Sequence, residues 1–193
     1  MGGLSNPCRR VQLLLPSFVV RTTNQVRRYV RSVMGTTVTS VLPDIEPTLA
    51  ATDPAAMQQF NHLLIAEFRA NGGQLSGQFT GLPMLLLNTR GTRSGTPRTT
   101  PIGYVRDGSS YVIMASNSGA PTHPAWFHNL LANPTATIEL GRERLVVRHR
   151  IAEGDERARL SERIVAQWPM GADYARMTTR VIPVVVLERG GAQ

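Results

Sequence analysis

Residues 84–115 have the sequence MLLLNTRGTRSGTPRTTPIGYVRDGSSYVIMA, and this stretch decides the fold class. It contains three short runs rich in residues typical of β-strands, at residues 84–88, 99–106 and 111–115. A glycine-rich connection separates the first two runs, and Asp107-Gly108 is a typical hairpin turn between the second and the third. Strands joined by tight turns pair antiparallel, so we expect an antiparallel sheet.

The rest of the chain adds strands and helices around this sheet. Further strands are expected at residues 135–140, 145–151 and 182–187. One helix is expected to begin at Asp53-Pro54, a capping carboxylate followed by proline, and to stop at Asn71-Gly72. Two more are expected at residues 124–133 and 155–167. Because a closed sheet has no exposed edges, we expect a small barrel: a mainly β fold with flanking helices, of the α+β class.

Length and composition limit the classes of protein to which this chain can belong. The 193 residues suffice for one domain with a sizeable core, and 41% hydrophobic against 18% charged residues is typical of a globular protein. The single cysteine, Cys8, excludes an intrachain disulfide framework and a cysteine-cluster metal site. His123 and His128 have the wrong spacing for a metal pair on one helix face, so we expect no metal site. Nothing requires an oxidising compartment, and we expect a cytoplasmic protein.

The positive charge is concentrated at the N-terminus. Residues 1–43 hold six arginines and no acid, whereas residues 44–193 hold 15 arginines and 13 acids. A high pI alone would favour nucleic-acid binding. Because the excess charge belongs to an extension and the rest is near neutral, we expect no nucleic-acid partner.

This charge pattern also predicts the domain organisation. We expect a basic extension at residues 1–43, a proline-containing linker at residues 44–52 and one folded domain at residues 53–193. Within the extension, residues 24–34 have the apolar spacing and interleaved arginines of an amphipathic helix. Such a helix can lie on the anionic inner face of a membrane. The alternatives are a mobile leader or an upstream start codon that the cell does not use.

The connection at residues 89–98 is the first candidate binding segment. Gly91 and Gly95 allow backbone N–H groups to converge on one point. Arg93 and Arg98 add forked, permanently charged donors that suit phosphate or carboxylate. The segment is therefore either an anion-binding cradle or a solvated turn. It is not a nucleotide P-loop, because no Gly-Lys-Ser/Thr follows.

A second candidate segment lies at residues 115–129. A strand ends there in small hydroxylated residues, and a helix then begins at Pro124 with free backbone N–H groups. Trp126 is expected either in the core or against a planar ring. No Ser/His/Asp set and no pair of catalytic carboxylates is recognisable in the sequence. An enzyme without these groups needs a cofactor to carry its chemistry.

Four linked motifs carry a family resemblance. They are LLLNTRGTRSGTPRTTP at residues 85–101, Asp107-Gly108, ASNSGA at residues 115–120 and HPAWFHNLLANP at residues 123–134. Together they resemble the deazaflavin-dependent nitroreductase family. The resemblance implies a split β-barrel related to FMN-binding barrels and the cofactor coenzyme F420, which has a phosphodiester and a polyglutamate tail. It also implies hydride transfer to a small-molecule acceptor that is quinone-like, nitro or otherwise conjugated.

The resemblance further implies a set of cofactor-binding residues. The phosphate and the acidic tail would be held by Thr92, Arg93, Ser94, Gly95 and Arg98. The deazaflavin would be lined by Ser116, Asn117, Ser118 and Gly119, with Ala125 and Trp126 at its edge. The family often has lysine at the positions of Arg93 and Asn117, so this chain keeps the first charge and lacks the second.

The acceptor pocket departs further from the family pattern. The family's nitroimidazole-activating member has a Tyr-Pro-x-Tyr-x-x-Tyr stretch, and the matching residues here run from Trp168 through Gly171 to Tyr174. These three residues would bind substrate, with glycine opening the pocket to bulkier acceptors. Tyr174 or Ser116 would act in catalysis by hydrogen-bonding the acceptor oxygen. Two alternatives stay open: the same barrel with FMN, and a non-catalytic deazaflavin carrier. The oligomeric state is not predicted.

Overall fold

The computed structural model of this chain describes residues 53–190. The predicted extension at residues 1–43, the linker at residues 44–52 and the amphipathic helix at residues 24–34 lie outside the described residues. The domain organisation and the membrane contact therefore stay predictions. No helix in the described part of the chain is long and apolar enough to cross a membrane.

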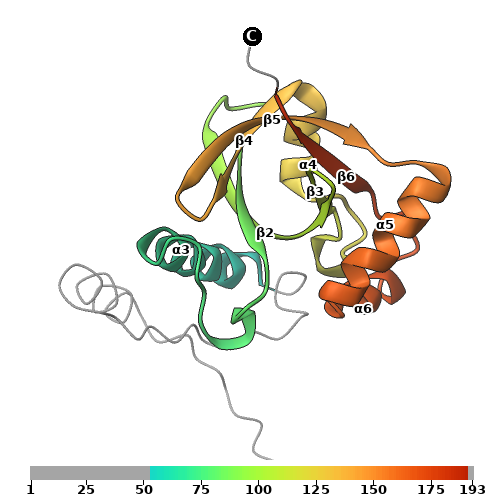
Figure 1. Ribbon diagram of the computed structural model, residues 1–193, viewed down its shortest axis with the longest axis horizontal. Coiled ribbons are helices and arrows are strands. Elements are labelled where there is room, and N and C mark those ends of the chain that lie inside the picture. The colour runs from blue at the N-terminus through green and yellow to red at the C-terminus, as the bar shows by residue number, and fades with distance from the viewer. Residues whose placement is uncertain (1–52, 191–193) are drawn as a thin grey trace, which may run out of the picture. The chain divides into compact units, whose positions relative to one another are not determined.

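Six antiparallel strands form a closed barrel in the described residues (Figure 1). They are β1 (Met84–Arg90), β2 (Pro97–Asp107), β3 (Ser110–Met114), β4 (Thr135–Leu140), β5 (Glu143–Ile151) and β6 (Val184–Arg189). The order around the barrel is β1-β2-β3-β6-β5-β4. The expected mainly β barrel is confirmed. The last strand begins two residues later than expected, after Pro183, which has no N–H to donate to a ladder.

Two pairings explain how the sheet closes. β1 and β2 form a hairpin whose register runs from Met84 opposite Gly103 to Arg90 opposite Pro97. The other edge of β1 pairs with β4, where Leu86 lies opposite Glu139. The chain therefore passes through β2 and β3 before β4 returns to the free edge of β1. Because β6 pairs with both β3 and β5, the closed sheet has no unpaired edge.

The strands bury both of their faces, in two separate cores. Leu85 and Leu87 of β1 pack inside the barrel, whereas Leu86 between them packs against the helices outside. The same alternation places Val185 and Leu187 inside and Val184 and Val186 outside. Continuous apolar runs such as residues 85–87 are the expected result when a strand is covered on both sides.

Helices supply the covers for these two cores. α3 (Pro54–Ala70) and α5 (Gly154–Gln167) contribute Phe60, Leu64, Phe68, Leu160 and Ile164 to the outer core. α4 (Ala125–Ala132) contributes Trp126, Phe127 and Leu130 to the inner one, so it closes the barrel interior (Figure 1). The structure also contains α6 (Met170–Arg176) and two short 3-10 turns, η1 (Gly77–Phe79) and η2 (Asn117–Gly119).

The start of α3 shows how directly local sequence sets local structure. The side chain of Asp53 accepts a hydrogen bond of 2.9 Å from the backbone N–H of Ala56, and proline follows at the first helical position. At the other end, the N–H of Asn71 donates to the carbonyl oxygen of Glu67. Both expected boundaries of this helix are confirmed. α6 was not expected, because seven residues give too short a periodic pattern to recognise.

Replacing Gly103 with alanine should destabilise the barrel. A Cβ atom on Gly103 would lie 2.4 Å from the indole ring of Trp168, which is buried between β2 and the outer helices. The ring and its neighbours would have to shift, and overpacking of this kind costs about 1–3 kcal/mol. We expect this loss in the free energy of unfolding, measured by urea denaturation.

Gly171→Ala is the matched control for that substitution. A Cβ atom there would lie 3.5 Å from Val165 and 3.8 Å from Met114, which are ordinary contacts. Because Gly171 lies inside α6, alanine should be neutral or stabilising by up to about 1 kcal/mol. Equal destabilisation by the two substitutions would contradict the packing argument.

Candidate functional site

Both candidate binding segments lie at the same end of the barrel. Antiparallel order places the end of β1, the start of β2, the end of β3 and the start of β6 together. The β1–β2 connection and the loop between β3 and α4 leave from this end. The Asp107-Gly108 turn and the β4–β5 turn leave from the other. Residues that are far apart in the chain thus form one potential site.

The β1–β2 connection is a hydrogen-bonded turn. The N–H of Gly91 donates to the carbonyl oxygen of Thr96 at 2.9 Å, and the N–H of Gly95 donates to that of Gly91 at 2.8 Å. Ser94 Oγ accepts from the N–H of Thr96 at 3.2 Å. Gly95 has a φ of 65°, in the left-handed region that favours glycine. The turn therefore has a defined shape rather than that of an extended solvated loop.

The charged side chains of this turn have no counter-charge of their own. Arg93 and Arg98 are exposed, as are Thr92, Ser94 and Gly95. Within residues 53–190, neither arginine forms an ion pair with a carboxylate. Two permanent positive charges are thus available to an anionic ligand, as the cradle prediction requires.

Asn129 of α4 connects this turn to the second segment. Its side chain is buried, with 6% of the residue exposed. Its Oδ1 accepts from the backbone N–H of Thr92 at 3.2 Å, and its Nδ2 donates to Oγ1 of Thr89 at 3.2 Å. We did not expect this role. The sequence held one signal for it. Asn129 places a side-chain amide between Trp126 and Leu130, on the apolar face of a short helix, where a buried amide needs hydrogen-bond partners.

The loop after β3 has a strained backbone. Asn117 and Ser118 both have a φ of 50°, which non-glycine residues rarely adopt. Asn117 Nδ2 donates to the carbonyl oxygen of Thr122 at 3.0 Å and so closes the loop from within. At Gly119, a Cβ atom would lie 2.6 Å from Cβ of Met177, so only glycine allows the loop to approach this end of α6.

Tyr174 of α6 meets this loop. Its hydroxyl donates to Sδ of Met170 at 3.9 Å. Burial raises the pKa of Tyr174, and the neighbouring Ser118 side chain opposes that rise. The phenol therefore keeps its proton at neutral pH and can donate a hydrogen bond. The structure brings together the predicted catalytic tyrosine and the predicted deazaflavin-lining loop.

Arg180, just before β6, holds the same loop from the other side. Its Nε donates to the carbonyl oxygen of Ala120 at 2.9 Å. Its Nη2 donates to those of Ala115 at 3.1 Å and Ser116 at 2.6 Å. Its Nη1 lies 3.0 Å from Nδ1 of His123. We did not expect a role for Arg180, because 57 to 65 residues separate it from these partners.

Of the remaining predicted residues, one is exposed and three are buried. Ala125 is exposed at the start of α4, whereas Trp126 is 7% exposed and packs inside the barrel, edge-on to Phe127. Trp168 is 8% exposed and packs in the outer core, with its indole N–H 3.4 Å from the carbonyl oxygen of Tyr104. Gly171 is buried. The substrate-binding roles of Trp168 and Gly171 stay predictions.

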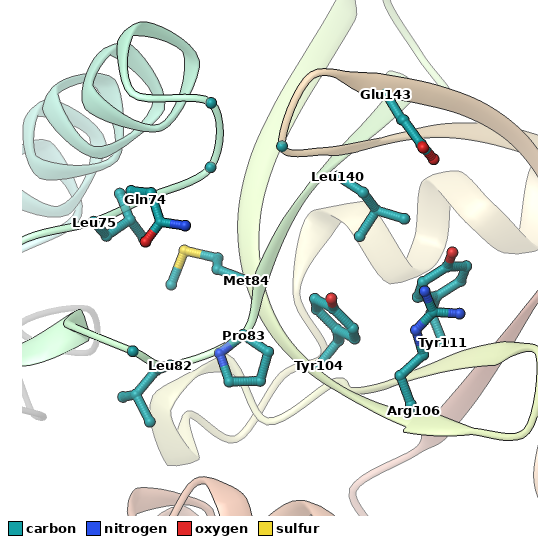
Figure 2. A pocket seen from close by; sticks show the side chains of 14 residues that line it. Gln74, Leu75, Leu82, Pro83, Met84, Tyr104, Arg106, Tyr111, Leu140 and Glu143 are labelled. Atoms are coloured by element: carbon teal, nitrogen blue, oxygen red, sulfur yellow. The ribbon is translucent and has the colours of Figure 1, made fainter.

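A cavity of about 520 Å³ opens at the other end of the barrel (Figure 2). Tyr104, Arg106, Tyr111 and Glu143 face it from the strands, and the guanidinium of Arg106 lies 4.3 Å from the ring centroid of Tyr111. No predicted site residue lines this cavity. It is therefore separate from the end that carries the two candidate segments.

Comparison with known proteins agrees with the motifs at the first barrel end. Residues 62–189 match the family model described as F420H(2)-dependent quinone reductase. The chain belongs to this family. The match covers both candidate segments and all six strands, and it confirms the resemblance seen in the sequence.

Individual relatives support the same assignment. An F420H(2)-dependent quinone reductase of Mycobacterium tuberculosis (strain ATCC 25618 / H37Rv) is 40% identical over 129 residues, which are 64% of this chain and 86% of the relative. A solved structure of an F420-H2 dependent reductase (FDR-A) is 36% identical, with a TM-score of 0.51, over 55% of this chain and 94% of that one. Another, described as a domain-swapped dimer, is 32% identical with a TM-score of 0.52, over 72% and 99%.

Asn129→Ala should loosen the β1–β2 turn. It leaves the backbone N–H of Thr92 and the hydroxyl of Thr89 without their partner, and a lost buried hydrogen bond costs about 1–3 kcal/mol. We expect a lower free energy of unfolding together with faster amide hydrogen exchange at Thr92.

Asn133→Ala is the control on the same helix. Its Nδ2 donates at 2.8 Å to the carbonyl oxygen of Asn129, within the helix itself. It should lower stability without changing exchange at Thr92. Unchanged exchange at Thr92 in Asn129→Ala would contradict the proposed connection.

Proposed function

We propose that this chain transfers hydride from reduced coenzyme F420 to a quinone acceptor. One observation carries the proposal: two unpaired arginines of the β1–β2 turn lie at the same barrel end as the loop that contacts Tyr174. Membership of the F420H(2)-dependent quinone reductase family supports both the cofactor and the acceptor class.

The residues at this end fit the chemistry of the coenzyme. Its phosphodiester and polyglutamate tail need several fixed positive charges and N–H donors, and Arg93, Arg98 and the Gly91–Gly95 turn provide them. The predicted ring-binding loop follows β3 at the same barrel end. When bound, the coenzyme supplies the hydride, and the protein supplies orientation.

The protein's own contribution to the reaction is positioning and a hydrogen bond. Tyr174 is half-buried, protonated at neutral pH and next to Ser118. A phenol in this position can donate to the acceptor oxygen as negative charge develops there. Ser116 is the other predicted donor, and its carbonyl oxygen is already held by Arg180.

Removing the cradle charges should weaken cofactor binding. Arg93→Ala and Arg98→Ala each delete a charged donor, and hydrogen bonds to charged groups contribute about 1.5–3 kcal/mol, or roughly 10- to 100-fold in Kd. Because the interaction is with an exposed anion, the loss should shrink at high salt. Titration of oxidised coenzyme F420, followed by fluorescence, measures it.

Arg142→Ala is the control, because it removes the same charge from the turn at the opposite barrel end. Its Kd for the coenzyme should match that of the wild type. FMN is titrated in parallel. If the protein bound FMN at micromolar concentration and did not bind coenzyme F420, the alternative FMN function would replace our proposal.

Tyr174→Phe should separate catalysis from cofactor binding. The substitution keeps the ring against the loop and removes the hydroxyl that would donate to the acceptor. Loss of one such donor lowers kcat by about 100- to 1,000-fold. The Kd for the coenzyme should stay within about twofold of the wild-type value. An unchanged kcat with a quinone acceptor would exclude Tyr174 as the donor.

A further inference from the structure

Arg180 carries a partly buried positive charge that no carboxylate neutralises. Within residues 53–190 its side chain forms no ion pair, and its hydrogen-bond partners are three carbonyl oxygens and one imidazole nitrogen. Burial of a charge without a counter-charge is costly, so such an arrangement requires several well-formed hydrogen bonds. All the carbonyl oxygens it binds belong to residues 115–120.

These hydrogen bonds oppose the strain of the loop. Asn117 and Ser118 are both in the left-handed region, which costs of order 1–3 kcal/mol at each non-glycine residue. Arg180 binds carbonyl oxygens on both sides of that pair, at Ser116 and at Ala120. The guanidinium thus fixes the two ends of the strained segment at one point and prevents its relaxation.

The contact with His123 restricts the protonation state of that histidine. Arginine can only donate, so Nδ1 of His123 must accept, and the imidazole must be neutral with its proton on Nε2. The charged and titratable groups facing His123 are Arg180 and His128, whose ring centroid is 6.0 Å away; the ring of Phe127 is 5.1 Å away. The pKa of His123 is lowered first by burial and second by electrostatic interaction with Arg180 and His128.

We propose that Arg180, together with neutral His123, is the positioning residue that holds residues 115–120 in the conformation that binds the cofactor ring. The inference rests on the proposed function, because it names the device that shapes the same site. Arg180 acts through the backbone of the loop and not through contact with the cofactor.

Protonation of His123 should release this loop. The proton on Nδ1 would remove the acceptor and place a second positive charge beside the guanidinium. Because the pKa is lowered when the loop is held, the released loop takes up the proton more readily. The held conformation is therefore fully favoured above the ordinary value of 6.5 and is lost as the pH falls below it.

Two measurements on full-length protein test the proposal. The first is amide hydrogen exchange of residues 115–123 without cofactor, corrected for the intrinsic pH dependence of exchange. The second is the Kd for oxidised coenzyme F420 between about pH 8 and pH 5. The variants are Arg180→Gln, Arg180→Lys and His123→Asn, since asparagine offers an acceptor oxygen near the place of Nδ1 and does not titrate. His128→Asn is the control, because His128 is a neighbouring histidine in α4 and is exposed.

Arg180→Gln should raise the Kd about tenfold or more and accelerate exchange in the loop, because several charge-assisted hydrogen bonds are lost. Arg180→Lys should recover only part of the affinity, since one ammonium cannot reach three carbonyl oxygens in the fork geometry. His123→Asn should bind the coenzyme at neutral pH with the wild-type Kd, and its Kd should not rise at low pH. In His128→Asn the Kd should still rise at low pH, as in the wild type.

Two results would overturn the proposal: wild-type loop exchange in Arg180→Gln, or a low-pH weakening that persists in His123→Asn. If Arg180→Gln did not fold, the His123→Asn comparison would still decide. A wild-type protein that failed to bind coenzyme F420 would refute the proposed function instead. In that case the exchange measurements, which need no cofactor, would still test the role of Arg180.

Discussion

Pairing of β1 with β4 is the constraint on which the rest of the structure depends. β4 can reach the free edge of β1 only after the chain has crossed the end of the barrel, and α4 makes that crossing. The helix must bury its apolar face in the barrel interior on the way. This places Asn129 beside the β1–β2 turn and the start of α4 beside the loop from β3. Closure of the barrel therefore also assembles the site.

The distribution of ion pairs separates structural arginines from available ones. Asp107 binds Arg159 and Arg163, and these arginines hold the pKa of its carboxyl below the ordinary range. Glu139 pairs with Arg69, and Arg150 pairs with Glu156 and Glu188. Many of the carboxylates in the described residues thus form ion pairs at other places than the β1–β2 turn and the loop at residues 115–120. A nearly neutral domain can still present unpaired positive charge at one end, where an acidic cofactor needs it.

Local patterns predicted much of the fold. The short β-type runs, the Asp107-Gly108 turn and the Asp53 cap each depend on a few neighbouring residues, and the structure agrees with all three. The β1–β2 connection was also recognisable as a candidate anion-binding segment, because its glycines and arginines lie close together in residues 89–98. The roles of Asn129 and Arg180 were not. A lone amide or arginine in a sequence has many possible partners, and only folding selects among them.

By itself the sequence determined the strands, their turns, the family and the charge of the cradle, because each is a property of short segments or of linked motifs. Tertiary structure decided which segments meet. Asn129 lies 37 residues from Thr92, and Arg180 lies 65 residues from Ala115. It also placed Trp168 in the outer core, whereas we expected this aromatic side chain to face a substrate. Contacts over such separations follow from barrel closure, which no local pattern encodes.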